Sequence, residues 1–199
     1  MGKLVHGIAA FVGCGVGLGV LATGPVGSPW GALALREHSG GLRVIDGNLH
    51  YADPRHPQIR ASRAVSATPE ECWRLWTTEE GLRSFLGRDS NVSLEIGGPY
   101  EVYFRIDNAR GRRGSEGCKV LSYLPERMLS FEWNAPPHFP LVRARRTRVV
   151  VLFEPAPEGT VVELVHLGFG EGDEWAKAHE YFTLAWPRVM DRFAAAANG

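Results

Sequence analysis

Alternating apolar and polar positions predict strands along most of the chain after residue 57. The first predicted strand runs from Ile59 to Val65, and six more follow after residue 90. They are expected at 92–96, 100–106, 118–121, 128–134, 146–154 and 160–169. Short turns, several of them rich in Gly or Pro, separate them, which is typical of hairpins in one antiparallel sheet.

Helical patterns lie on both sides of these six strands. A threonine N-cap, a proline and two acidic residues follow one another where the first helix begins, at Pro69. A second short helix starts at Thr78 and ends near Phe85. From 173 to 197 apolar residues recur at helical spacing, which predicts a long amphipathic helix. Pro187 either kinks this helix or marks the start of its second half.

A long helix that follows an antiparallel meander is most simply placed across the concave face of the sheet. The alternation along each strand then selects the side chains that face the helix. They are Tyr100, Val102, Phe104, Leu129, Phe131, Trp133, Val149, Val151, Phe153, Val162, Leu164 and His166. The sequence therefore predicts an α+β fold with an aromatic-lined space between sheet and helix, either packed solid or hollow.

The first 22 residues are an apolar run behind a single basic residue. No Lys, Arg, Asp or Glu lies between Lys3 and Arg36. This layout is typical of a secretory signal, here with a cleavage site after Ala22. The alternative is an uncleaved membrane anchor, since the run is about long enough to cross the ~30 Å hydrocarbon core. We expect export to the periplasm or the cell exterior, or membrane anchoring, and a cytoplasmic protein only without a leader.

Residues 23–58 differ in composition from the rest of the chain. They are rich in Gly and Pro, which predicts an extension outside the main core. Within it, Asp46 and Gly47 lie between two apolar runs, the strongest short-range signal for a hairpin. We expect a small extra hairpin over 42–51, and the main domain over 59–197.

Charge and chemistry limit the function further. The chain has 199 residues with 22 Lys+Arg against 22 Asp+Glu, so its formal net charge is zero and no global field attracts nucleic acid. We expect no nucleic-acid partner, no cofactor and no metal. Arginines cluster at 110–113 and 143–148, where they either contact an anionic head group or are solvated. Cys72 and Cys118 have the spacing of neither a zinc site nor a disulfide scaffold, and a bond between them is left open.

Several motifs, in this order along the chain, resemble the START-like (SRPBCC) superfamily. They are 67–77 (ATPEECWRLWT), 96–100 (IGGPY), 125–133 (PERMLSFEW), 159–169 (GTVVELVHLGF) and Trp186. The sequence looks closest to the group named after the C-terminal domain of the activator of heat-shock protein 90 ATPase, over residues 59–197. The resemblance implies a helix-grip fold, in which a curved antiparallel sheet wraps around a long C-terminal helix. Two short helices follow the first strand, and a pocket is left for an apolar ligand.

The predicted ligand pocket combines rings from the strands and the helices. Its candidate residues are Trp76, Phe85, Tyr100, Phe104, Phe131, Trp133, Val151, Leu164, His166, Phe182 and Trp186. We expect it to hold a small hydrophobic or amphipathic molecule without catalysis. The alternatives are an enzyme of the cyclase or hydrolase type that uses His166 as acid or base, and a co-chaperone-like domain with a protein partner. Any contact with a membrane would come from the N-terminal segment, if it is not cleaved.

Overall fold

The computed structural model describes residues 42–45, 48–51 and 57–199. The leader predicted at 1–22 and most of the extension at 23–58 lie outside these residues, so both stay predictions. Within the described part of the chain, no helix has the length and apolar character needed to cross a membrane.

Two short strands precede the main domain. Strand β1 (Leu42–Ile45) pairs antiparallel with β2 (Asn48–Tyr51), and Leu42 lies opposite Tyr51. They lie where the sequence predicts a hairpin, whose two turn residues are outside the described part of the chain.

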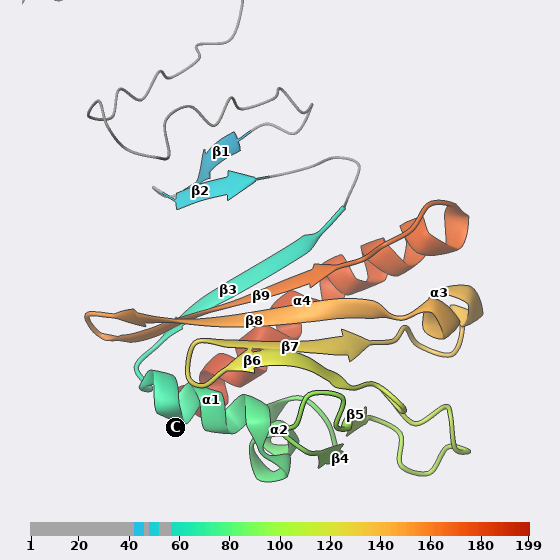
Figure 1. Cartoon of the computed structure of the whole chain (residues 1–199), viewed down its shortest axis with the longest axis horizontal. Helices are drawn as coiled ribbons and strands as arrows, with labels where there is room; N and C mark the ends of the chain where they lie inside the picture. The colour runs from blue at the N-terminus through green and yellow to red at the C-terminus, as the bar shows by residue number, and fades with distance from the viewer. Residues whose placement is uncertain (1–41, 46–47, 52–56) are drawn as a thin grey trace, which may run out of the picture. The chain divides into compact units, whose positions relative to one another are not determined.

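A five-stranded antiparallel sheet is the scaffold of the main domain (Figure 1). In spatial order its strands are β3 (Ile59–Val65), β9 (Gly159–Leu167), β8 (Thr147–Ala156), β7 (Met128–Trp133) and β6 (Val120–Leu124). Within this sheet, the first strand in sequence, β3, pairs with the last, β9, so that Ile59 lies opposite His166 and Val65 opposite Thr160. This pairing places the start of the domain beside the strand that leads into the C-terminal helix.

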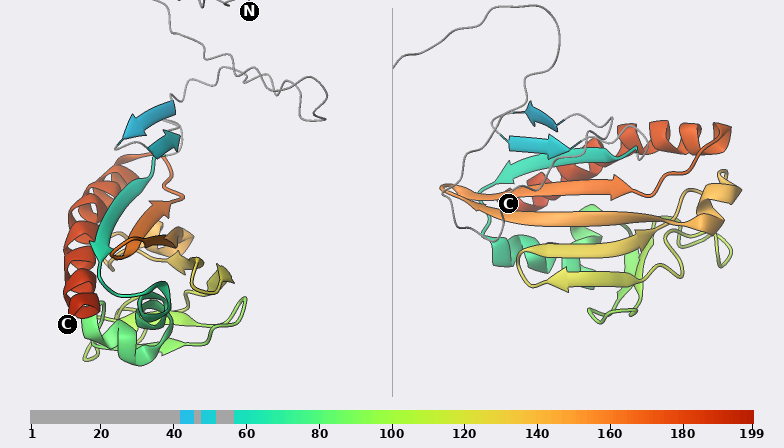
Figure 2. Two further views of the ribbon diagram at one scale, coloured as in Figure 1. Left: turned by 90° about the vertical axis from the view of Figure 1, so that its left-hand side faces the viewer. Right: turned by 45° about the horizontal axis from the view of Figure 1, so that its top comes forward.

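Helix α4 (Asp173–Asn198) lies along one face of the sheet, as both views of Figure 2 show. Its buried side chains recur every three or four residues and form one continuous stripe: Ala178, Phe182, Trp186, Val189, Met190 and Phe193. The helix continues through Pro187 without a break. The Pro187 carbonyl accepts a hydrogen bond from Arg63 of β3 at 3.2 Å, and Arg63 also pairs with Asp191 at 2.6 Å. These contacts fix the outer side of the helix to the edge of the sheet.

The two short helices form where their caps predict. Helix α1 (Pro69–Thr77) begins with a capping box, in which Thr68 Oγ1 accepts from the Glu71 amide at 3.2 Å and the Glu71 carboxylate accepts from the Thr68 amide at 2.8 Å. Thr78 caps α2 (Glu79–Phe85) in the same way, through the amide of Gly81 at 3.0 Å. Local sequence therefore decides this part of the fold.

The sheet differs from the predicted single meander. Strands β4 (Asp89–Val92) and β5 (Tyr100–Tyr103) form a separate pair. The turn before β5 contacts the start of β6 through a bridge between Pro99 and Lys119 and through Val120 N, which donates to Gly98 O at 2.9 Å. The strand expected at 92–96 begins earlier, because the chain turns where Gly98 N donates to Glu95 O at 2.8 Å. Helix α3 (Pro140–Arg145), of six residues, has no counterpart among the predicted elements.

Burial confirms the predicted inward face. Eleven of the twelve side chains expected to face the helix are at most 4% exposed. The exception is Phe104, which is 37% exposed because β5 ends at Tyr103 and the chain then leaves the strand.

Replacing Phe131 by alanine is expected to lower the free energy of unfolding by about 3–5 kcal/mol, because the ring is fully buried and leaves a cavity. Ile96→Ala is the matched control, since this side chain is 75% exposed, and it should change stability by less than about 0.5 kcal/mol. Urea unfolding followed by fluorescence measures both. Equal losses in the two variants would contradict the assigned core.

Candidate functional site

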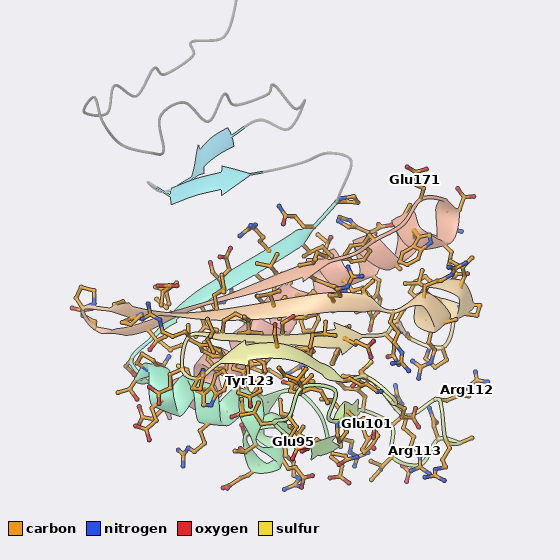
Figure 3. All side chains as sticks on the ribbon, viewed as in Figure 1. Glu95, Glu101, Arg112, Arg113, Tyr123 and Glu171 are labelled. Carbon is orange, nitrogen blue, oxygen red and sulfur yellow. The ribbon has the colours of Figure 1, made fainter. Side chains whose placement is uncertain are left out.

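A cavity of about 730 Å³, which is not enclosed but widely open to solvent, lies between the middle of α4 and the two loops that follow β5 and β7. Its walls come from residues 104–114, from residues 133–138 and from one face of α4 between Tyr181 and Arg192, with Leu86 and Arg143 added. The loop after β5 carries Arg112 and Arg113, which Figure 3 labels at its lower right.

Four of the predicted pocket residues line this cavity: Phe104, Trp133, Phe182 and Trp186. Their rings pack in sequence, with 6.1 Å between the centroids of Phe104 and Trp133 and 5.4 Å between those of Trp133 and Trp186. Phe182 stacks on Trp186 at 6.1 Å. The result is a continuous aromatic wall contributed by a loop, a strand and the helix.

The other predicted pocket residues lie in the packed core and not among the lining residues: Trp76, Phe85, Tyr100, Phe131, Val151, Leu164 and His166. Each is at most 3% exposed, and three rings of the wall are nearly as buried, with Trp133 and Phe182 at 4% and Trp186 at 2%. The wall is therefore the outer edge of the same core cluster. Tyr100 stacks on Phe131 at 4.0 Å, and Phe85 contacts Phe193 at 5.5 Å. Near Phe193, in the C-terminal part of α4, rings from α2, β5 and β7 fill the space between helix and sheet. The alternation along the strands does not show whether this space is filled or empty.

His166 lies inside the wall, fully buried, between α4 and the sheet. Trp186 Nε1 donates to His166 Nδ1 at 2.8 Å, and His166 Nε2 lies 2.6 Å from Thr147 Oγ1, which donates to the Trp133 carbonyl at 3.1 Å. An indole N–H can only donate, so the proton of the imidazole is assigned to Nε2. Burial lowers the pKa of His166 to about 3. The ring is therefore neutral at pH 7, with both nitrogens engaged, which fits a structural residue.

Several lining residues were not anticipated from the sequence, above all those on the second face of α4. Tyr181, Leu184, Arg188 and Arg192 recur every three or four residues beside the buried stripe. Tyr181 and Leu184 are 40% and 60% exposed. The signal that could have found them is the pair of bulky apolar residues on the otherwise polar side of the helix.

Arg143 of α3 joins the two loops that form the cavity wall. Its Nη1 donates to Ala135 O at 2.6 Å, and its Nη2 donates to Gly111 O at 2.7 Å and to Gly114 O at 2.9 Å. Glu116 lies 3.4 Å from Nη2 and accepts the Gly111 amide at 2.6 Å. One guanidinium and one carboxylate thus satisfy the backbone of a loop that has no regular secondary structure.

Neither a reactive thiol nor a metal site is found among the described residues. Cys72 and Cys118 are free and buried, so the bond left open by the sequence is not formed. Burial raises the pKa of both thiols, that of Cys118 to about 12, which disfavours the reactive thiolate. Within the described part of the chain, no cluster of three or more His, Cys, Asp or Glu side chains is arranged to hold a metal ion.

The curved antiparallel sheet with a long C-terminal helix across it and two short helices after the first strand defines a START-like, helix-grip protein. The chain belongs to the family described as Activator of Hsp90 ATPase homolog 1-like protein, whose sequence model matches residues 66–198. Both the predicted fold and the predicted family are therefore confirmed. No curated protein matches the chain.

Solved structures share this fold at low sequence identity. Protein MLL2253 from Mesorhizobium loti is 21% identical, with a TM-score of 0.57 over 70% of this chain and 96% of that one. The Aha1 dimer from Colwellia psychrerythraea is 17% identical, with a TM-score of 0.54 over 71% and 96% of the two chains. DynU16, a protein of the dynemicin biosynthetic locus, is 16% identical, with a TM-score of 0.52 over 69% of this chain and 46% of that one.

Arg143→Met is expected to lower the free energy of unfolding by about 2 kcal/mol, because several carbonyls and the Glu116 carboxylate lose their donor. Arg145→Met is the control, since that exposed side chain makes no hydrogen bond or ion pair with the described residues. Chemical denaturation measures both, and limited trypsin digestion should cut the 104–116 loop faster in the first variant alone. Equal behaviour of the two variants would contradict the role given to Arg143.

The pKa of His166 predicts a loss of stability in acid. Because the folded-state pKa of about 3 lies below the unfolded value of 6.5, the unfolded chain binds the extra proton between these limits. The free energy of unfolding is therefore highest above pH 6.5 and decreases as the pH falls, so that at pH 5 it is about 2 kcal/mol lower than at neutral pH.

Urea unfolding at pH 7.5 and pH 5 measures this loss in the natural protein and in the variants His166→Gln and His138→Gln. The first variant should have the smaller pH dependence, and the second, at an exposed position, should keep it. If His166→Gln does not fold, nitrogen NMR of the natural protein decides: an imidazole that charges near pH 6 contradicts the assignment.

Proposed function

We propose that this chain binds a small hydrophobic or amphipathic molecule, without catalysis, in the cavity beside α4. The observation that carries the proposal is the volume of about 730 Å³ behind a wall of four aromatic rings. Pockets for small molecules are usually 300–1,000 Å³ in volume and mainly apolar. The START-like fold, which commonly binds hydrophobic ligands, supports the same proposal.

The wall is held in place before any ligand arrives. Trp186 is oriented by its hydrogen bond to His166, and the ring of Trp133 packs between Phe131 at 5.8 Å and Trp186 at 5.4 Å. A ligand that enters such a site does not have to order the rings it contacts, so less of the binding energy is lost to conformational entropy.

The composition of the lining favours binding over catalysis. Among the described lining residues there is one histidine, His138, and there is no carboxylate, thiol or aliphatic hydroxyl. Covalent and acid–base mechanisms need a nucleophile or a positioned acid and base within hydrogen-bond reach of the substrate. The family description also names an activator of a chaperone ATPase, and a protein partner is the alternative function for this chain. The leader predicted at 1–22 would place the site outside the cytoplasm, a proposal that rests on the sequence alone.

Binding of the neutral fluorescent probe N-phenyl-1-naphthylamine, together with native mass spectrometry of the purified full chain, tests the proposal. Ala185 lines the cavity and lies half-buried on α4, so Ala185→Trp should fill part of the space and weaken probe binding about tenfold or more. Ala195→Trp on an exposed position of the same helix is the control and should bind as the natural protein does. The absence of both probe binding and any copurified small molecule would overturn the proposal.

A further inference from the structure

The charged residues among the described lining of the cavity are all positive. Arginines reach its rim from three separate elements, the loop after β5, helix α3 and helix α4: Arg105, Arg112, Arg113, Arg143, Arg188 and Arg192. Aspartate and glutamate are absent from the described lining. We propose that the natural ligand is an anionic amphipath, with one oxyanion head group at this rim and an apolar body against the aromatic wall. The inference rests on the proposed binding function and names the chemical class of its ligand.

Not all of these arginines are available to a ligand. Arg143 is occupied by backbone carbonyls and by Glu116. Arg113 donates through Nε to Asn108 O at 3.0 Å, and Arg192 donates through Nε to Phe85 O at 2.8 Å, which leaves the Nη atoms of Arg192 unoccupied.

Three cations on the rim have no partner at all among the described residues: Arg105, Arg112 and Arg188. Together with the Nη atoms of Arg192, they present guanidinium donors from two sides of the opening. A guanidinium offers a planar fork of N–H groups that matches the geometry of carboxylate, sulfate and phosphate.

Elsewhere in the described part of the chain arginines are of both kinds. Arg60 pairs with Glu163 at 2.7 Å and Arg146 pairs with Glu132 at 2.6 Å, while Arg63 pairs with an aspartate on α4. Arg74, Arg145 and Arg148 also make no side-chain hydrogen bond or ion pair with the described residues, so the lack of a partner does not by itself distinguish the rim. What distinguishes the rim is the number of arginines in one lining that has no carboxylate among its described residues. The whole chain has as many acidic as basic residues, so positive charge at the cavity is a local feature. The same 104–116 segment carries two acids: Glu116 is engaged with Arg143, and Asp107 is exposed outside the lining. A local positive field of this kind attracts and orients anions.

Helix α4 gives the ligand a direction. Leu184, Arg188 and Arg192 are spaced four residues apart, so they lie in one row along the helix. Tyr181 and Leu184 make the N-terminal part of this row apolar, and the two arginines make the next turns cationic. The head group is therefore placed toward Arg188 and the apolar body toward Phe182 and Trp133.

Displacement of N-phenyl-1-naphthylamine by a matched series of twelve-carbon compounds tests the inference: dodecanoate, dodecyl phosphate, dodecanol and dodecyltrimethylammonium. The two anions should bind about tenfold or more tightly than the alcohol, the cation should bind weakest, and added salt should reduce the advantage of the anions. Inorganic phosphate alone should not displace the probe, because it has no apolar body. The two anions together distinguish a carboxylate ligand from a phosphate ligand.

Variants assign the effect to the rim. Arg188→Gln combined with Arg105→Gln should reduce the affinity for dodecanoate to that for dodecanol, without changing the affinity for the alcohol. Arg74→Gln, on the exposed surface of α1, removes the same charge elsewhere and should leave both affinities unchanged.

The outcomes separate the two proposals. If dodecanol binds as tightly as dodecanoate, or if the rim variants bind dodecanoate like the natural protein, the inference is overturned and the binding function stands. If inorganic phosphate displaces the probe as well as dodecyl phosphate does, the site recognises the anion alone and the inference is again overturned. If none of the compounds and not even the probe binds, the proposed function fails as well.

Discussion

A chain of hydrogen bonds runs from Trp186 of α4 through His166 of β9 and Thr147 of β8 to the carbonyl of Trp133 on β7. It crosses the interface between helix and sheet through buried side chains, so a shift of α4 by a fraction of a turn would leave an indole N–H and an imidazole nitrogen without partners. Apolar packing alone tolerates such a shift better, because it is not directional. The chain therefore sets the rotation of α4, and with it the face that the helix presents to the cavity.

The cavity exists because the space under α4 is filled unevenly. Trp76 and Phe85 from the two short helices, with Phe131 from the sheet, pack against the C-terminal part of α4 and leave no room there. The loops after β5 and β7 lie beside the middle of the helix, and their rings border the cavity: Phe104 lines it, and His138 and Phe139 each lie 6.0 Å from Tyr181 of α4 between ring centroids. Arg143 holds both loops to α3 through their backbone carbonyls, which fixes the cavity wall that they form. Pocket and core are thus two parts of the same interlayer space.

Much of the fold could be predicted from the sequence, because strand alternation and helix caps are local signals. The cap threonines and the inward residues of β7, β8 and β9 are all found where the pattern places them. The site was harder, because it depends on which rings fill the space and which line it. Leu164 and Phe104 occupy equivalent positions in the alternating pattern, yet Leu164 is fully buried and Phe104 is 37% exposed. The difference arises because β5 ends at Tyr103, one residue before Phe104. Arg143 belongs to a cluster that the sequence marks, but its structural role could not be predicted, because its partners are carbonyls of loops whose path the sequence pattern does not specify.

The arginines at the rim carry an electrostatic cost in the absence of an anion. Like charges that share an opening repel one another, and solvent weakens this repulsion only in part at exposed groups such as Arg105, Arg112 and Arg188. Arg105 and Arg188 come from separate elements, so no local helix or strand rule places them together. Neither forms an ion pair with a described residue, whereas Arg63 of β3 pairs with Asp191 of α4. An anion at the opening relieves the repulsion, at the cost of part of the hydration of both partners. Because the aromatic wall is already ordered, the net electrostatic gain accompanies the gain from burying an apolar body.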